Sequence, residues 1–341
     1  MTEQSLEARV SAYLSNRLGG DVRVDTLRRF PVGFSWATFG VDLVADPGVA
    51  LPACSLILRM GADDGLYAPY SSKRQFQVLA ALERSPMPTP RVYWHSDDRR
   101  LLGAPFFFCE RSVGRAPLPS AGAPDDPVPE HRANLGSQFV VALAQLHQFD
   151  WRAAPELTDW EPGVTVDNTA LHQVEVCVED YRRWAMQPEP TVLWAANWLR
   201  RHAPKASRLC IVHGDYRIGN FLVQDGRITA MLDWESTHIG DPNEDLGWAS
   251  LAQFNGGSGL VSRLLPEADF FRRYEERTGW QVDVDVVRYY GVMSMLKLAL
   301  VNLAAAQRFQ LSGTSDIRMA ALATQSTSTL RQVQKLIEAV Q

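Results

Sequence analysis

The segment "IVHGDYRIGNFLVQDGRITAMLDWE" (residues 211–235) constrains the fold most, because its short apolar runs end at polar side chains. Asp215 follows the first run, Asn220 precedes the second, and Asp233 ends the third. The Asp225-Gly226 dipeptide is a strong signal for a tight β-hairpin turn. Such a hairpin is expected to return Asp233 to the neighbourhood of Asn220.

Two interpretations fit these three residues. In the first, the oxygens of Asn220 and Asp233 hold Mg²⁺, which takes few protein carboxylates and leaves coordination open for phosphate. Asp215 then accepts a proton from a hydroxyl nucleophile. In the second, Asp215 and Asp233 cap turns and Asn220 forms an Asx-turn. For each residue alone the second is the commoner case, but the combined spacing favours the first.

The first third of the chain has the pattern of an antiparallel sheet. Runs rich in β-branched and aromatic residues alternate with turn residues. A helix that starts after Ser71 or Ser72 and carries Phe76, Leu79 and Leu82 interrupts them. The expected strands are "VRVDTLRRF" (22–30), "WATFGVDLVA" (36–45), "CSLILRM" (54–60), "RVYWH" (91–95) and "PFFFCER" (105–111).

The remaining two thirds are mainly helical. The proline-rich stretch 116–130 is expected to be a loop. Apolar residues at helical spacing then predict further helices, including long ones over about 284–308 and 317–339. The fold class is therefore α+β, with a β-rich N-terminal domain at 1–113 and a larger helical domain at 114–341.

Composition limits the function classes. The chain has 341 residues, 46% hydrophobic residues and a formal charge of −5, which gives no basic surface for nucleic acid. Its four cysteines have no metal-binding spacing, which indicates a reducing compartment. We find no signal peptide and no apolar run of roughly 18 residues that a membrane span needs. We therefore expect a cytoplasmic protein without membrane or nucleic-acid partners, and make no prediction of its oligomeric state.

The string His213-Gly214-Asp215, with Asn220 and Asp233 downstream, resembles the aminoglycoside phosphotransferase family. That family has a two-lobed protein-kinase-like fold, and the loop matches the kinase H-R-D-x-x-x-x-N signature. The stretch "LDWESTHIGDPNEDLGWAS" resembles the branch related to the kinase-like domains attached to acyl-CoA dehydrogenases. The resemblance places the interlobe hinge at about 108–114.

The resemblance implies a role for each residue of the loop. Asp215 would be the catalytic base, and Asn220 and Asp233 would hold Mg²⁺ on the nucleotide phosphates. Arg217 lies where protein kinases carry a lysine that contacts the transferring phosphoryl group. The alternative for Arg217 is a solvent-exposed salt bridge.

Other residues of this region are expected to support the loop. The resemblance implies that His213 is a structural member of the loop. Asp241 and Asp245 would cap a helix and brace the loop. His147 lies on an apolar helix and is expected to be a satisfied core histidine.

The resemblance also implies nucleotide contacts in the N-terminal lobe. Adenine would meet main-chain groups of Glu110 and Ser112, and Gly33 and Ser35 belong to the loop that covers the nucleotide.

Two positions depart from the family pattern. Arg59 stands where a strand lysine for the α/β-phosphates is usual, and arginine serves as a bidentate phosphate ligand. Gln75 stands where the partner glutamate is expected, so a hydrogen bond replaces the ion pair.

The favoured hypothesis is an ATP- or GTP-dependent phosphotransferase that acts on a hydroxyl of a small molecule. The acceptor is not identified by the sequence. One alternative is a nucleotide-binding regulatory module without transfer activity, which Gln75 and the altered loop at Gly33 suggest. Another is a metal-dependent hydrolase that uses His213, Asp215, Asp233 and His238.

Overall fold

The computed structural model describes residues 5–31, 33–61, 63, 65–119, 126–311 and 316–340. The chain divides into two compact units. The first comprises Met1–Ala80 and Pro90–Ser112, and the second comprises Ala81–Thr89 and Val113–Gln341. The division falls one residue before the expected boundary, and the segment 81–89 joins the helical unit.

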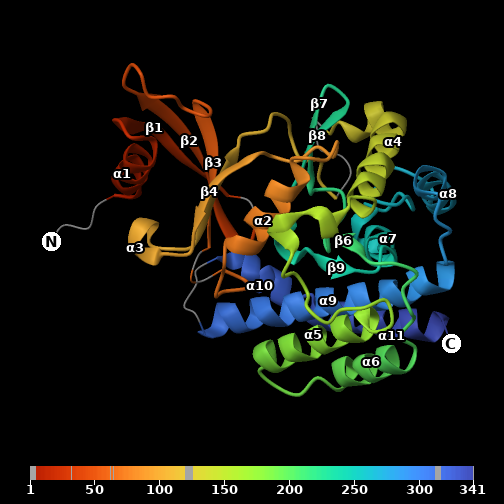
Figure 1. The fold of residues 1–341 in the computed structure, drawn as a ribbon. Helices are drawn as coiled ribbons and strands as arrows, with labels where there is room; N and C mark the ends of the chain where they lie inside the picture. Colours follow the sequence, from red (N-terminus) through yellow and green to blue (C-terminus); the bar gives the residue numbers. More distant parts are fainter. Residues whose placement is uncertain are drawn as a thin grey trace. The chain divides into compact units, whose positions relative to one another are not determined.

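The first unit is built on a five-stranded antiparallel sheet with the order β1-β2-β3-β5-β4 (Figure 1). The five predicted strands are all present, with ends that differ by at most a residue or two. β3 lies between β2 and β5, so that Arg59 is paired with Thr38 on one side and Phe107 on the other. The strands are β1 (Val22–Phe30), β2 (Trp36–Ala45), β3 (Ser55–Gly61), β4 (Val92–Ser96) and β5 (Phe106–Glu110).

Helix α1 (Leu6–Leu18) closes the apolar core of this unit. Ser5 caps its start by accepting the Ala8 N–H, and Gly19 ends it in the left-handed region. The predicted helix after Ser72 is α2 (Lys73–Leu82). A one-turn helix, α3 (Arg99–Leu102), was not expected. The buried core combines α1 with the sheet: Val10, Leu14, Val41, Leu56, Leu58, Phe106 and Phe108.

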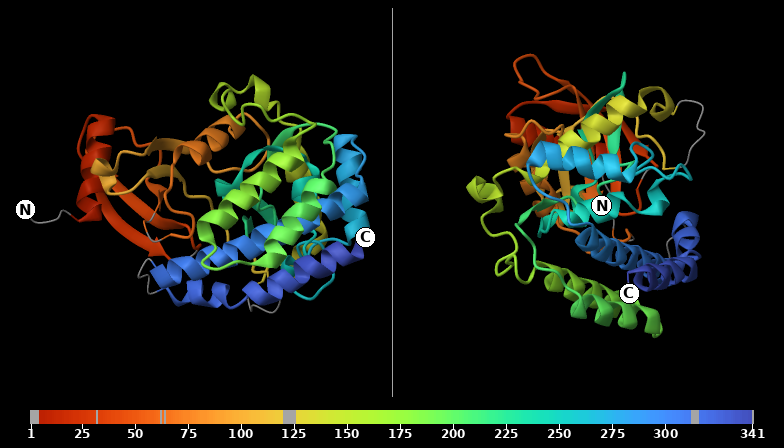
Figure 2. Two further views of the ribbon diagram at one scale, coloured as in Figure 1. Left: turned by 90° about the horizontal axis from the view of Figure 1, so that it is seen from below. Right: turned by 90° about the vertical axis from the view of Figure 1, so that its right-hand side faces the viewer.

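The second unit is mainly helical and is organised around α9 (Val284–Leu311), which packs against α5, α6, α7, α10 and α11. The left view of Figure 2 shows the two green helices α5 and α6 side by side. The other helices are α4 (Val128–His147), α5 (Thr169–Trp184), α6 (Pro190–Arg201), α7 (Asn243–Ala249), α8 (Glu267–Thr278), α10 (Ile317–Ala323) and α11 (Ser326–Ala339), with short 3₁₀ helices at Trp151–Ala153, Pro155–Leu157, Trp234–Ser236 and Ala252–Phe254.

Two expectations for this unit were wrong. The predicted loop 116–130 is too long, because α4 already begins at Val128, where prolines suit the first helical turn. Residues 120–125 of that loop lie outside the described residues. The helix expected over 317–339 is interrupted at Thr324 and Gln325.

Two small sheets carry the polar loop of the opening motif. β6 (Cys210–Val212) pairs with β9 (His238–Gly240), a strand that the sequence pattern did not indicate. β7 (Phe221–Gln224) pairs with β8 (Arg227–Met231) as the predicted hairpin. Its turn residues have φ of 50° at Asp225 and 70° at Gly226, as a type I′ turn requires.

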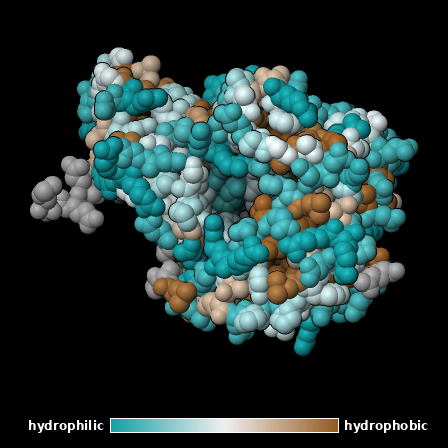
Figure 3. Space-filling model, turned by 60° about the horizontal axis from the view of Figure 1, so that its bottom comes forward, coloured by the Kyte–Doolittle hydropathy of each residue, from teal (hydrophilic) through white to brown (hydrophobic). Residues whose placement is uncertain are grey.

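Helix α9 is long and apolar enough to cross a membrane by length and composition, contrary to the sequence expectation. However, 72% of its most apolar window is buried inside the structure, as in the central helix of a globular core. On the molecular face in Figure 3, hydrophilic side chains predominate and hydrophobic ones form separated patches.

Candidate functional site

The carboxylate of Asp215 lies at the centre of the candidate site in the second unit. Its Oδ1 accepts hydrogen bonds from Arg217 Nε (2.7 Å) and Trp248 Nε1 (2.8 Å). Its Oδ2 accepts one from Asn220 Nδ2 (2.5 Å) and a longer one from Arg217 Nη2 (3.3 Å). The side chain keeps 21% of its surface exposed, so it is held firmly but remains accessible.

Arg217 pairs with Asp215 itself. Its third contact is a hydrogen bond to the Ile218 carbonyl (2.9 Å), and its guanidinium carbon lies 4.9 Å from the centre of the Phe254 ring. The salt bridge that was the alternative is thus present, with the Arg217 side chain 23% exposed. The structure therefore places this cation beside the expected base. Its contact with a phosphoryl group stays a prediction.

The hairpin brings Asp233 back to Asn220, as the spacing predicts. The carbonyl of Asn220 accepts the N–H of Leu232 (2.8 Å), the residue before Asp233. Asn220 is 2% exposed, and its amide nitrogen also donates to the Asp215 carbonyl (2.9 Å). Asp233 adopts φ 60° and ψ 61°, a left-handed conformation that is uncommon outside glycine.

The donor set at Asn220 and Asp233 fits Mg²⁺. The side-chain nitrogen of Asn220 donates to Asp215, so the side-chain oxygen of Asn220 is the atom that could bind a metal ion. An amide oxygen and a carboxylate are hard ligands, and nucleotide phosphates commonly complete such sites. Among the described residues, no group of three or more His, Cys, Asp or Glu side chains is placed to hold a metal ion. A magnesium–nucleotide site does not need such a group, because the phosphates supply further ligands.

His213 is a structural member of the loop. Its Nδ1 faces the Asp215 N–H (3.2 Å), which assigns the proton to Nε2, and Nε2 donates to the Leu232 carbonyl (2.9 Å). Burial lowers the pKa of His213, which favours this neutral tautomer.

His238 is also engaged at both nitrogens, with the Ser236 carbonyl (3.0 Å) and Glu244 (3.1 Å). With His213 likewise engaged, neither imidazole is left as a metal ligand. The described residues therefore do not support the metal-dependent hydrolase.

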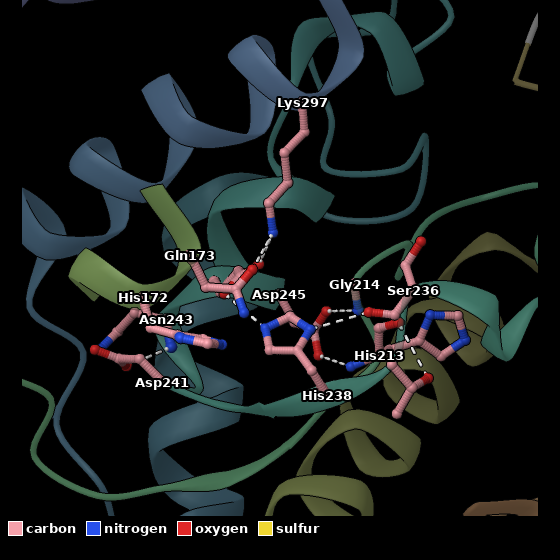
Figure 4. A network of polar contacts seen from close by, with 12 residues as sticks. His172, Gln173, His213, Gly214, Ser236, His238, Asp241, Asn243, Asp245 and Lys297 are labelled. Atoms are coloured by element: carbon pink, nitrogen blue, oxygen red, sulfur yellow. Dashed lines mark hydrogen bonds and ion pairs between the residues drawn. The ribbon is translucent and has the colours of Figure 1, made fainter. Parts of the chain in front are cut away.

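Asp245 is fully buried and holds the main chain of the loop (Figure 4). Its oxygens accept the N–H groups of His213 (2.7 Å) and Gly214 (2.9 Å). His147 contacts the same carboxylate (3.1 Å) and the Tyr274 hydroxyl (2.7 Å). The prediction that His147 is a satisfied core histidine is confirmed, and the structure adds that it supports Asp245.

A second buried network lies beside this one. Lys297 reaches from α9 to Gln173 (Figure 4) and also donates to Glu244. Although burial opposes ionisation, the charges of Lys297 and His238 hold the pKa of Glu244 at about 2. These contacts tie α5, α7, α9 and β9 together.

Asp241 begins the turn into α7. Its Oδ1 accepts the main-chain N–H (2.9 Å) and the side-chain amide (2.8 Å) of Asn243, while Oδ2 is buried without a hydrogen bond of good geometry. Burial raises the pKa of Asp241 to about 6, against the effect of the Asn243 hydrogen bonds. Asp241 thus organises the start of the helix that carries Asp245.

The residues predicted to contact the nucleotide lie in the first unit. Arg59 is half-buried on β3, and Gln75 is 5% exposed on α2. Gly33 has φ 76°, which favours glycine in this turn, and Ser35 is 7% exposed. Glu110 ends β5 with its N–H donated to the Arg91 carbonyl (2.8 Å), and Ser112 is half-buried. Their contacts with a nucleotide stay predictions.

The sequence patterns did not single out Trp248 from the ten tryptophans of the chain. The signal was present in the spacing. Trp248 follows Asp245 by three residues on α7, so both side chains share one helical face. That face is turned toward the loop that carries Asp215.

A family model for the "Phosphotransferase enzyme family" matches residues 26–282, which is most of the chain. The curated relatives are proteins considerably longer than this chain. Acyl-CoA dehydrogenase family member 11 from Rattus norvegicus is 28% identical over 297 residues, covering 84% of this chain and 35% of the relative. Family member 10 from Mus musculus is 24% identical over 253 residues, covering 69% of this chain and 23% of the relative. The chain thus spans about a quarter to a third of these two relatives.

Solved structures share the fold. A protein from Ralstonia eutropha JMP134 that is named for the aminoglycoside phosphotransferases superposes with a TM-score of 0.73 at 23% identity, covering 97% of this chain and 98% of that one. Macrolide 2'-phosphotransferase type I gives a TM-score of 0.60 at 21% identity, covering 95% and 98%. The fold is therefore protein-kinase-like, with an antiparallel N-terminal sheet and a helical C-terminal part. With three quarters of its length matched by the family model, the chain belongs to the phosphotransferase enzyme family.

Proposed function

We propose that this protein transfers the γ-phosphoryl group of ATP or GTP to a hydroxyl group of a small molecule. The observation that carries the proposal is the partly exposed carboxylate of Asp215, which Asn220 and Trp248 hold from two sides. A fixed carboxylate that substrate can reach is the group such a reaction needs as its base. Family membership supports phosphoryl transfer in general.

In the proposed reaction Asp215 orients the acceptor hydroxyl and takes its proton as the new oxygen–phosphorus bond forms. The bond from the γ-phosphorus to the bridging oxygen of the β-phosphate breaks in the same step, and ADP or GDP leaves. Arg217, which pairs with Asp215 at 2.7 Å, would turn toward the incoming phosphoryl group. Alignment and charge stabilisation account for most of the catalysis in such a site.

Asn220 and Asp233 would hold Mg²⁺ through an amide and a carboxylate oxygen, ligands that this ion prefers. When bound, the ion would neutralise charge on the nucleotide phosphates. The chain's own contribution is rigidity, since Asn220 is buried and is anchored to Asp215 and Leu232.

Two observations support a nucleotide as the donor. Structures with the same fold are described with nucleotides, including ADP with hygromycin B in APH(4)-Ia and GDP in aminoglycoside 2'-phosphotransferase IIIa. In this chain, Arg59 on β3 supplies a cation for the phosphates, and Gly33 permits a tight turn. Both donors are therefore included in the proposal.

One observation favours a second candidate, a nucleotide-binding module without transfer activity. Gln75 is buried where the resemblance implies an ion-pairing glutamate, and a glutamine side chain offers a hydrogen bond in place of a charge. Such a module would bind Mg·ATP without transferring phosphate to any hydroxyl compound.

A library of hydroxyl compounds, screened for consumption of MgATP and MgGTP, separates the two candidates. We expect transfer to at least one compound, and a fall in turnover of about 10²–10⁴-fold in Asp215→Asn with nucleotide binding retained. Asp225→Asn is the matched control, because Asp225 is exposed at the hairpin turn and Asn tolerates its positive φ. Near wild-type transfer by Asp215→Asn would contradict the assignment, and binding without any transfer would favour the module.

A further inference from the structure

The side chain of Asp215 is held from outside its own loop. Three of its four hydrogen bonds come from Arg217 and Asn220, which belong to the loop. The fourth comes from the indole Nε1 of Trp248 at 2.8 Å, on helix α7. Of the four hydrogen bonds described for this carboxylate, only that from Trp248 comes from a separate element of the structure.

Helix α7 is a rigid support for that contact. At Gly247 an added Cβ would lie 2.9 Å from the nitrogen of Gly291 and 2.9 Å from the carbonyl of Val287, so α7 packs directly on the backbone of α9. Trp248 is 7% exposed and its ring lies tilted against that of Phe254, with ring centres 5.8 Å apart. The indole therefore has little freedom to move away from Asp215.

The same helix also fixes the main chain of the loop. Asp245 accepts the N–H groups of His213 and Gly214, and Trp248 lies three residues further along the same helical face. One face of α7 thus contacts both the backbone that precedes Asp215 and the Asp215 carboxylate. Rotation of that carboxylate about its side-chain torsions is restrained by a hydrogen bond anchored in the core.

Trp248 and Arg217 restrain Asp215 in different ways. Arg217 is a charged donor, and two of its hydrogen bonds occupy both oxygens of Asp215. In the proposed reaction Arg217 moves toward the phosphoryl group and vacates these positions. Trp248 on Oδ1 and Asn220 on Oδ2 then remain, and each oxygen keeps a lone pair for the acceptor hydroxyl. An indole N–H carries no net charge, so it can orient the carboxylate without forming an ion pair with it.

We propose that Trp248 is a positioning residue, whose indole N–H sets the orientation in which Asp215 meets the acceptor hydroxyl. This inference rests on the proposed function of Asp215 as base. It is distinct from that function, because Asp215 can be the base whether or not Trp248 orients it.

The contact is tested first, without any substrate. The ten tryptophan indole signals of the full chain are recorded by ¹H–¹⁵N NMR, and the one that disappears in Trp248→Phe is assigned to Trp248. Asp215→Ala removes the acceptor and is expected to move that signal upfield. The matched control is Asp159→Ala, an exposed aspartate, which should leave it in place. A Trp248 signal that does not respond to Asp215→Ala overturns the proposal.

Turnover is tested next, with MgATP and MgGTP as donors and with water and the alcohols of the library as acceptors. Loss of a hydrogen bond to a charged group predicts a fall in kcat of about 10–100-fold for Trp248→Phe, with the KM for the nucleotide within twofold of wild type. The matched control is Trp151→Phe, which also removes an indole hydrogen bond, here to the Leu209 carbonyl (3.4 Å), and should keep wild-type kcat.

The outcomes separate the two proposals. If Asp215→Asn lowers turnover by about 10²–10⁴-fold while Trp248→Phe keeps kcat within twofold of wild type, Asp215 is the base and the role of Trp248 is wrong. If Asp215→Asn transfers phosphate at nearly the wild-type rate, the proposed function itself fails. If Trp248→Phe lowers both kcat and the melting temperature, it is compared with a variant destabilised in α6 that has the same Tm. An equal loss of kcat in the α6 variant overturns the positioning role. A wild-type kcat in the α6 variant supports it.

Discussion

The buried carboxylate of Asp245 accepts the backbone N–H of His213 at 2.7 Å. Its second oxygen accepts the next N–H along the chain, that of Gly214, at 2.9 Å. One side chain on α7 therefore satisfies two successive amides at the start of the candidate catalytic loop. This arrangement requires an acceptor at both oxygens.

Asp245→Asn is expected to destabilise the protein, because an amide offers one acceptor oxygen and places its NH₂ group against the other N–H. Loss of a buried hydrogen bond to a charged group typically costs about 1.5–3 kcal/mol. The free energy of unfolding, measured with urea, should fall by that amount, and activity should fall with it. Asp225→Asn, at an exposed turn, should change neither. An unchanged free energy of unfolding in Asp245→Asn would show that these two hydrogen bonds do not stabilise the protein.

Gly214→Ala should disable the loop. Gly214 has φ 79°, and a Cβ there would lie 2.5 Å from the Ser236 carbonyl oxygen. Gly163 provides a matched comparison, since its φ is 88° and nothing lies within 4 Å of an added Cβ. Gly163→Ala therefore has the backbone strain alone, roughly 1–2 kcal/mol. Gly214→Ala has the same strain together with a clash that adds about 1–3 kcal/mol.

Urea unfolding and phosphoryl transfer measure this pair. We expect transfer to be retained in Gly163→Ala and lost in Gly214→Ala. Equal stabilities for the two variants would mean that the Ser236 main chain moves away without cost.

Glu244 should make the protein sensitive to acid. The pKa of Glu244 in the folded state is about 2, below its ordinary value of 4.5. A lowered carboxyl pKa contributes stability that is fully present above pH 4.5 and is lost as the pH falls toward 2. The difference corresponds to about 3 kcal/mol. In Glu244→Gln, unfolding free energies measured between pH 2.5 and 7 should lose this part of their pH dependence. If the free energy of unfolding depends on pH equally in Glu244→Gln and in the wild type, Glu244 is not the source of the acid sensitivity.

Asp241 should make the protein less stable as the pH rises, which is the opposite of the effect of Glu244. Burial raises the pKa of Asp241 from 3.8 to about 6, so the folded state holds its proton more tightly than the unfolded state. Stability therefore falls as the pH rises from 3.8 to 6, and the cost is complete above pH 6. Asp241→Asn should raise the melting temperature at pH 7.5, with a gain of up to about 3 kcal/mol, and should have less effect at pH 4. A lower melting temperature at pH 7.5 would contradict this, and would point to the Asn243 contacts as the dominant role of the carboxylate.

The strands and the hairpin could be predicted because their signals are local. The runs at 22–30 and 36–45 coincide with β1 and β2, and Asp225-Gly226 forms the turn that its φ angles allow. The hairpin in turn predicts the return of Asp233 to Asn220. Alternation, turn chemistry and strand length act over a few residues, so one sequence is enough to reveal them.

Strand β9 and the contact of Trp248 with Asp215 were not predicted, because each depends on an element that lies far away in the sequence. β9 is a three-residue strand that exists because β6 lies beside it. Trp248 reaches Asp215 across 33 positions of sequence, and His147 reaches Asp245 across 98. The sequence by itself determined which residues carry the candidate chemistry, because residue type and local spacing set what each group can donate, accept or bind. Only the tertiary structure decided which groups hold Asp215 in place, because those contacts depend on how α7, α9 and the loop pack.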